Sequence, residues 1–171
     1  MPFSFRPASR SRGRAALGGC LLWAAGLLSS PVNPAGQEEY AVVVSPDVPV
    51  SNLSMDQLHR LFLFRERYWK PGLAVTVLLS EDGLEPGSFL LEKIYRMDYA
   101  SLRRLILEKL YQAEIDLAPK VVASDEVAVA FVASGRGLVA FVRANAAHGS
   151  SVKVVSIDGV PPGAPGYVLR R

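Results

Sequence analysis

The sequence predicts an α/β fold: a mixed sheet of about five strands with helices on both faces. Two observations support this fold class. Short apolar runs rich in β-branched residues alternate with segments whose apolar residues recur at helical spacing. Clusters of Pro, Gly, Asp and Ser separate these segments and are typical of turns. The 171 residues suit one domain, and we find no internal repeat and no low-complexity tract.

The first 37 residues differ in composition from the rest. Four arginines occur between Arg6 and Arg14, followed by an uncharged, mostly apolar run from Ala15 to Leu28 and then by small and turn-forming residues. This order is typical of a secretory signal peptide. A membrane-spanning helix needs about 20 apolar residues, and this run is shorter. We therefore expect residues 1–37 to be a cleaved signal peptide and residues 38–171 to be a periplasmic domain that does not span the membrane.

Removal of this segment changes the charge and the chemistry of the chain. It takes away four of the nineteen basic residues and none of the sixteen acidic ones, which leaves a net charge of −1. The basic pI of the whole sequence is therefore no indication of a nucleic-acid partner. The only cysteine, Cys20, also leaves, so residues 38–171 have no disulfide, thiol nucleophile or thiolate metal ligand.

The first half of the domain contains two predicted strands and one predicted helix. Residues 40–44 are a short apolar run typical of a buried strand. A helix is expected to begin at Ser54, with Gln57 as its capping-box partner. Residues 73–79 are predicted to form one further strand. The buried face of the helix is expected to contain Met55, Leu58, Leu61 and Phe62.

Three more helices and further strands are predicted in the second half. Helices are expected from Ser88, after Asp98 and after Ser124, each of which can cap a helix N-terminus. Strands are expected at residues 120–123, 137–142 and 152–157. The core-facing side chains of the last helix are expected to be Val127, Ala130 and Phe131.

The order of these segments resembles a known family. The first strand leads into Ser-Pro-Asp-x-Pro at residues 45–49. The later segments that carry the resemblance are Leu53-Ser54-x-Asp56-x-Leu58-x-x-Leu61-Phe62, Trp69-Lys-Pro-Gly72, Ser124-Asp125-x-Val127, Gly135-x-Gly137-Leu-Val-Ala-Phe-Val142 and Ile157-Asp158-Gly159-Val160-Pro161. Together they resemble the substrate-binding proteins of phosphate ABC transporters, a group related to periplasmic binding proteins, over about residues 40–169.

The resemblance implies one lobe of a type II periplasmic binding protein, because the chain has no residues left for a second lobe. It implies an exported, non-enzymatic solute-binding protein without a cofactor, with phosphate or another small anion as ligand and a transporter or another envelope protein as partner. The alternative is an accessory module of the cell envelope that has lost its ligand and serves for interaction.

The anion-binding segment departs from the family pattern. In the family an Arg followed shortly by Ser-Gly-Thr opens a helix and holds the anion. Here the Arg position falls near Ser80 or Glu81, and only Gly87-Ser88 remains of the second motif. Glu81, Asp82 and Glu85 are acidic and would repel an anion. The family's phosphate site is therefore not expected to carry over unchanged.

Three residues are candidates for ligand binding. Gly87 and Ser88 stand at a predicted helix start, where free backbone N–H groups favour an anion. The alternative role of Ser88 is an ordinary N-cap. Ser45 follows the first strand, at the kind of position where open α/β sheets bind ligands. Its alternative role is a turn residue before Pro46.

No pattern of catalytic or metal-binding residues is apparent. His59 and His148 have no second His or carboxylate at metal-ligand spacing. The chain has no Gly-x-Ser-x-Gly sequence around a nucleophile, and its carboxylates are not arranged as a catalytic pair. The sequence therefore predicts a binding protein without catalytic residues or a metal.

Overall fold

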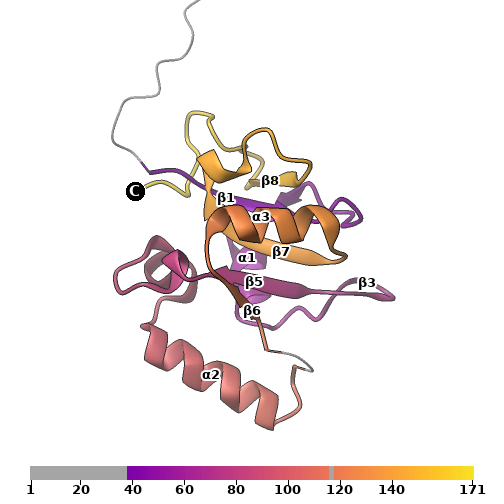
Figure 1. Ribbon diagram of the computed structural model, residues 1–171, viewed down its shortest axis with the longest axis vertical. Coiled ribbons are helices and arrows are strands. Elements are labelled where there is room, and N and C mark those ends of the chain that lie inside the picture. Colours follow the sequence, from indigo (N-terminus) through magenta and orange to yellow (C-terminus); the bar gives the residue numbers. More distant parts are fainter. Residues whose placement is uncertain (1–37, 116–117) are drawn as a thin grey trace, which may run out of the picture. The chain divides into compact units, whose positions relative to one another are not determined.

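The computed structural model describes residues 38–115 and 118–171, so the predicted signal peptide lies outside the described residues. A six-stranded mixed sheet forms the centre of the domain, in the order β2-β8-β1-β7-β5-β6 (Figure 1). The strands are β1 (Tyr40–Val44), β2 (Asn52–Leu53), β5 (Thr76–Ser80), β6 (Lys120–Val122), β7 (Leu138–Arg143) and β8 (Lys153–Ile157).

The strand directions determine which loops meet. β5 runs parallel to both β6 and β7, whereas β1 runs antiparallel to β7 and β8. Parallel strands end at the same edge of a sheet. The carboxyl ends of β5, β6 and β7 therefore share one edge with the beginning of β1.

Helices cover both faces of the sheet, as predicted. α3 (Asp125–Ser134) packs on one face (Figure 1), over a core that includes Val43, Leu78 and Ala140. The other core contains side chains from α1 (Met55–Phe62), from the π-helix Leu90–Tyr95 and from α2 (Tyr99–Tyr111). Alternate residues of a strand point to opposite faces of the sheet. Because nearly all residues of β1 and β7 are buried, these two strands contribute side chains to both cores. Short 3-10 turns occur at Asp82–Leu84 and Ala144–Ala147.

The predicted start of α1 is confirmed. The Ser54 hydroxyl accepts a hydrogen bond from the Gln57 amide at 3.1 Å, and the Gln57 side chain accepts one from the Ser54 amide at 2.8 Å. This reciprocal capping box satisfies two amides that have no partner within the helix. Leu58, Leu61 and Phe62 are buried, so the capped helix presents its apolar stripe to the core.

The single strand predicted for residues 73–79 is wrong. Its first part is β4 (Leu73–Ala74), which forms a separate hairpin with β3 (Tyr68–Lys70), whereas Thr76 begins β5 in the main sheet. The Val75 amide donates to the Arg67 carbonyl, and the Thr76 amide donates to the Gly137 carbonyl. The chain thus changes hydrogen-bonding partners between these two residues, which an apolar run alone does not reveal.

The predicted inward face of α3 is also wrong. Val127 and Phe131 are 38% and 50% exposed, and Ala130 is exposed as well. The buried apolar residues are Ala128, Val129 and Val132. Both faces of this helix are apolar, so the spacing alone could not decide its rotation. Asp125 decides it, because its buried carboxylate bonds to β5 and β7 and shares the face of the buried residues.

The helix predicted to begin at Ser88 is present as the short π-helix. Leu91, Ile94 and Tyr95 are buried in it, as expected, and Arg96 ends it with a φ of 56°. The expected cap of α2 is present too, because the Asp98 carboxylate accepts from the Ser101 amide at 2.7 Å. Within residues 38–115 and 118–171, every helix is too short or too polar to cross a membrane.

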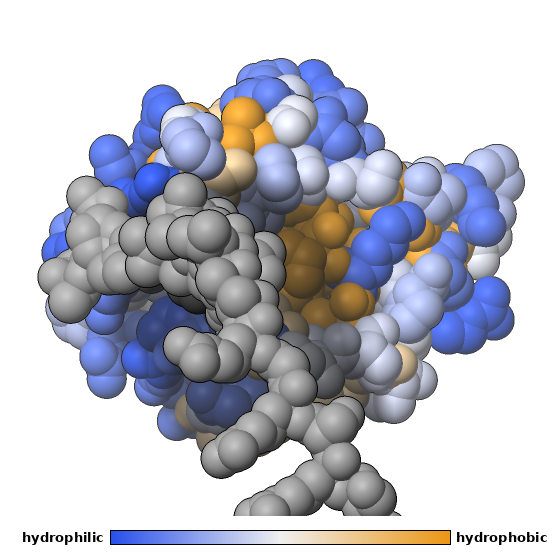
Figure 2. Space-filling view, turned by 90° about the horizontal axis from the view of Figure 1, so that it is seen from above, coloured by the Kyte–Doolittle hydropathy of each residue, from blue (hydrophilic) through white to orange (hydrophobic). Residues whose placement is uncertain are grey.

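Exposed large apolar side chains are not spread evenly over the domain. The face seen in Figure 2 is mostly hydrophilic, with a hydrophobic area set in a hollow. Elsewhere α2 and α3 carry several exposed apolar residues. The most exposed ones among the described residues are Tyr68, Tyr99, Leu107, Tyr111, Val121, Val127, Phe131, Val154 and Val168.

Candidate functional site

A pocket of about 320 Å³ opens at the edge of the sheet where β5 and β7 end. Four parts of the chain form it: the last residues of these strands, the first turn of α3, the segment from residue 82 to residue 90, and the two ends of the described chain. It therefore lies at the carboxyl ends of parallel strands, where open α/β sheets place their ligands.

Asp125 holds the inner wall of the pocket together. Its carboxylate is buried and accepts a hydrogen bond from the Ser80 hydroxyl at 2.6 Å. The second carboxylate oxygen accepts from the backbone amide of Arg143 at 2.9 Å and from its Nε at 3.1 Å. A buried carboxylate with three donors is well satisfied. This network fixes the end of β5, the end of β7 and the start of α3 relative to one another.

Arg143 brings a guanidinium to the pocket. Its Nη2 forms an ion pair with Asp82, and its side chain remains 41% exposed. Burial acts to lower the pKa of Arg143, but attraction by Asp125 and Asp82 outweighs it and raises the pKa. The guanidinium is therefore always charged and is oriented by the buried carboxylate beside it.

Ser88 and Gly87, both predicted from the sequence, line this pocket. The Ser88 hydroxyl donates to the Gly83 carbonyl at 2.6 Å and accepts from the Leu91 amide at 3.4 Å, which is the contact expected of a cap. Gly87 has a φ of 77°, and its carbonyl accepts from the Arg171 Nη1 at 2.8 Å. The chain turn at these residues thus brings a second guanidinium to the pocket.

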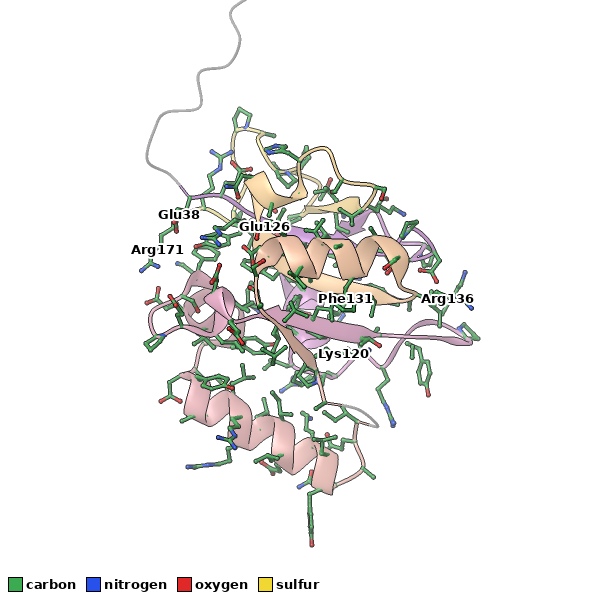
Figure 3. The ribbon with its side chains drawn as sticks, in the orientation of Figure 1. Glu38, Lys120, Glu126, Phe131, Arg136 and Arg171 are labelled. Carbon is green, nitrogen blue, oxygen red and sulfur yellow. The ribbon has the colours of Figure 1, made fainter. Side chains whose placement is uncertain are left out.

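Arg171 lies at the rim beside Glu38 (Figure 3). Its amide donates to the Glu38 carbonyl at 2.9 Å, and its Nη2 lies 3.9 Å from the Glu92 carboxylate. The neighbouring Tyr40 amide donates to the Leu169 carbonyl at 2.9 Å. The two ends of the described chain therefore pair with each other and complete the pocket.

Three aromatic rings form the apolar side of the pocket. Tyr40 stacks on Phe89 at a centroid distance of 4.7 Å and on Phe141 at 5.3 Å. The Tyr40 hydroxyl donates to the Glu38 carboxylate at 2.9 Å. Burial, together with this hydrogen bond and the charge of Glu38, raises the pKa of Tyr40 to about 12. The phenol is therefore neutral at physiological pH and acts as a donor at the rim.

Ser45 lies at the other end of β1 and is not brought together with Gly87 and Ser88. Because β1 is antiparallel to β7, its carboxyl end lies beside Leu138, where β7 begins. The Ser45 hydroxyl is buried and accepts from the Leu138 amide at 3.1 Å, and its carbonyl accepts from the Val48 amide. These contacts fit the turn role. A ligand at Ser45 would occupy a different edge of the sheet from the pocket.

The charge of the pocket is dominated by acids. Two guanidiniums face four carboxylates, so the lining carries a net charge of −2. The charged residues among the lining are Glu38, Asp82, Glu85, Asp125, Arg143 and Arg171. No group of three or more His, Cys, Asp and Glu residues in the described part of the chain is placed to hold a metal ion.

Sequence reasoning did not identify Asp125, Arg143 and Arg171 as pocket residues. In the sequence Asp125 follows the expected cap residue Ser124 and belongs to a segment that carries the resemblance, and neither feature marks it as a pocket residue. The two arginines follow strand-like segments without a motif around them. One signal was available for Arg143. It directly follows the strand predicted at residues 137–142, a position that lies at the ligand-binding edge when the strand is parallel to its neighbour, and the structure shows that β7 is parallel to β5.

No protein-family model matches the chain, and no curated protein matches its sequence. Several solved structures share its fold. A phosphate transport receptor of the ABC type from Vibrio cholerae superposes with a TM-score of 0.60 at 18% identity, over 80% of this chain and 55% of that chain. A putative phosphate ABC transporter substrate-binding protein with bound phosphate from Clostridium perfringens gives 0.58 at 16% identity, over 79% and 53%.

A third similar structure is PstS from Borrelia burgdorferi, with a TM-score of 0.55 at 15% identity over 79% of this chain and 55% of that chain. The fold is therefore that of part of a substrate-binding protein, which confirms the predicted lobe. The chain spans about half the length of these solved structures. At such low identity the likeness establishes the fold and leaves the ligand to be argued from this chain's own residues.

Proposed function

We propose that this chain is an exported, non-enzymatic protein of the solute-binding type that takes a small oxyanion at Arg143. The observation that carries the proposal is the placement of this guanidinium. Buried Asp125 holds its Nε, which turns the remaining N–H groups toward the pocket. Nη1 has no hydrogen bond to any described residue, so donors remain for a ligand. Planar guanidinium donors suit the oxygens of a phosphate-like anion.

The fold of the similar structures supports this proposal. The protein from Clostridium perfringens contains bound phosphate, and the one from Vibrio cholerae is a phosphate transport receptor. For the present chain a phosphate-like ligand and a transporter partner remain part of the proposal, as does export through a signal peptide within residues 1–37. Mass spectrometry of the protein purified from cells that express the full-length chain tests export, since a mass lacking these residues is expected.

The acidic pocket favours a second function, a ligand-free accessory module of the cell envelope. An oxyanion at Arg143 has to displace or tolerate Asp82, which is 44% exposed and belongs to a pair of the kind that contributes about 0–1 kcal/mol. Breaking that ion pair costs little free energy, but the negatively charged lining still repels an anion. The balance between these two effects decides between the functions.

Calorimetric titration of the purified protein with inorganic phosphate tests the proposal, and Asp82→Asn gives the sharpest comparison. Removal of this negative charge frees Arg143 and reduces repulsion, so phosphate affinity should rise about tenfold. The matched control is Glu81→Gln, which removes the neighbouring exposed carboxylate outside the pocket lining. We expect the control to change phosphate affinity much less than Asp82→Asn.

Ser88→Ala tests the role of the predicted helix start in the same assay. A loss of phosphate affinity beyond any loss of stability would support a ligand contact, whereas equal affinity with a lower melting temperature would show that Ser88 is only a cap. If neither the unsubstituted protein nor Asp82→Asn binds phosphate, sulfate or arsenate at millimolar concentration, oxyanion binding is rejected and the accessory module is supported.

A further inference from the structure

The pocket at the ends of β5 and β7 carries more negative charge than its own cations neutralise. Asp82 and Asp125 both form ion pairs with Arg143. Two further carboxylates line the pocket, those of Glu38 and Glu85, and both side chains are exposed. Neither forms an ion pair with a residue that the structure describes. The surplus negative charge of the pocket therefore lies on these two residues.

Arg171 does not neutralise this charge, although it lies beside Glu38 (Figure 3). Its Nη1 donates to the Gly87 carbonyl at 2.8 Å, and its Nη2 lies 3.9 Å from Glu92, which is outside the pocket lining. The Glu38 carboxylate instead accepts a hydrogen bond from the neutral Tyr40 phenol. A carboxylate can accept about four hydrogen bonds, so Glu38 keeps acceptor positions for a positively charged group.

The pocket is also larger than a bare oxyanion requires. Its volume of about 320 Å³ has room for about ten water-sized groups, and a phosphate ion fills about half of that space. Part of the remaining wall is apolar, because the lining includes Pro86 and the stacked rings of Tyr40 and Phe89. A short carbon chain can lie against such a wall without leaving a polar group unpaired. The pocket thus has room for an oxyanion with a short carbon chain attached.

We propose that the ligand is a phosphate ester or phosphonate that carries an ammonium group on a short carbon chain. This inference rests on the proposed oxyanion site, since the phosphate oxygens bind at Arg143. The ammonium group has three N–H donors, and it donates them to the carboxylates of Glu38 and Glu85. The positive charge of such a ligand offsets the repulsion that a purely anionic ligand meets in this pocket.

Calorimetric titration of the purified protein with phosphoethanolamine and with ethyl phosphate tests this inference. The two compounds share a phosphate group and a two-carbon chain, and only the first has an ammonium group. At about pH 8 both phosphate groups are fully ionised and the amine stays protonated. Phosphoethanolamine should bind about tenfold more tightly, because it forms two exposed ion pairs of modest strength. Added salt should reduce this preference, since it screens exposed charges.

Glu38→Gln and Glu85→Gln separate recognition of the ammonium group from a general loss of stability. Each should weaken phosphoethanolamine binding about threefold, because one ion pair is lost. Each should strengthen ethyl phosphate binding, because one repelling charge is removed. Both side chains are exposed, and Gln at position 38 still accepts from the Tyr40 hydroxyl. Glu81→Gln is the matched control outside the pocket lining, and the ratio of the two affinities should stay the same.

The outcomes distinguish this inference from the proposed function beneath it. Equal affinity for phosphoethanolamine and ethyl phosphate overturns the inference and leaves oxyanion binding intact, and so do variants at positions 38 and 85 that weaken both ligands equally. Ethanolamine lacks the phosphate group and should bind far more weakly than phosphoethanolamine. If ethanolamine binds as tightly, or if neither phosphate compound binds at millimolar concentration, the oxyanion site itself is rejected, and the inference is rejected with it.

Discussion

Gly137 stands at the entrance to β7 in a conformation that few other residues adopt. Its φ is 66°, and a Cβ at this position would lie 2.2 Å from the backbone carbonyl oxygen of Ala74. The Gly137 carbonyl also accepts from the Trp69 Nε1 at 2.9 Å and from the Thr76 amide. Because this glycine joins the β3–β4 hairpin to the main sheet, the close approach of two backbones there depends on the missing side chain.

Gly137→Ala should therefore destabilise the protein strongly. A backbone carbonyl cannot move aside as a flexible side chain can, so the free energy of unfolding should fall by more than about 2 kcal/mol. Gly149→Ala is the control, because Gly149 has a similar φ of 71° with no atom within 4 Å. It should lose only the backbone strain, about 1 kcal/mol. Urea denaturation measures both, and equal losses would contradict the steric explanation.

Single residues also limited what the sequence could predict about the pocket. Gly87 and Ser88 were recognisable because a Gly-Ser pair before an apolar run is typical of a helix start. Asp125 was not, since an acid in a first turn normally faces solvent and interacts with the helix dipole. Only the folded structure shows that this carboxylate turns inward to meet Ser80 and Arg143.

At the scale of elements, α1 is the part whose sequence determines its structure most directly. Its capping box depends on Ser54 and Gln57, two residues only three positions apart in the first turn, so it is visible in the sequence and present in the structure. α3 shows the opposite situation. Its cap was predictable for the same reason. Its rotation about the helix axis, however, depends on Asp125 and on strands far away in the chain. Because both faces of α3 are apolar, the sequence does not indicate which face is buried.

Ser54→Ala tests the contribution of the capping box. The Gln57 amide would lose its acceptor at the first turn of α1, and the free energy of unfolding should fall by about 1 kcal/mol. Ser51→Ala is the matched control, because Ser51 is exposed and only its backbone carbonyl takes part in a hydrogen bond. Thermal denaturation followed by circular dichroism measures both, and an unchanged Ser54→Ala protein would show that the cap is dispensable.

At the scale of the whole molecule, the prediction of fold class succeeded because strand and helix patterns alternate along the chain. Strand direction was not predictable in the same way. Ser45 was placed at a ligand-binding edge on the basis that it follows a strand, but β1 runs antiparallel to its neighbours in the sheet, which moves its end away from the pocket. The pocket instead joins residues from both ends of the domain, a proximity that only long-range pairing creates.

The pairing of the two ends of the domain around Tyr40 also predicts how the protein responds to alkaline pH. Tyr40 packs near the chain ends, and Tyr95 and Tyr167 are buried elsewhere in the same core. Burial raises the pKa of all three phenols, that of Tyr40 to about 12. In the unfolded chain a tyrosine ionises near pH 10. The folded state therefore favours the protonated phenols, and their contribution to stability is complete below about pH 10.

As the pH rises from about 10 through about 12, the unfolded chain ionises first, and the free energy of unfolding should decline steadily. Urea denaturation across this range measures the decline. Tyr40→Phe should make it shallower, because the substitution removes one ionisable phenol and keeps the stacked ring, whereas Tyr111→Phe on an exposed side chain serves as the control. If the slope is the same for Tyr40→Phe as for the control, the Tyr40 phenol is not protected by the fold, and the closure of the chain ends around it is looser than the structure indicates.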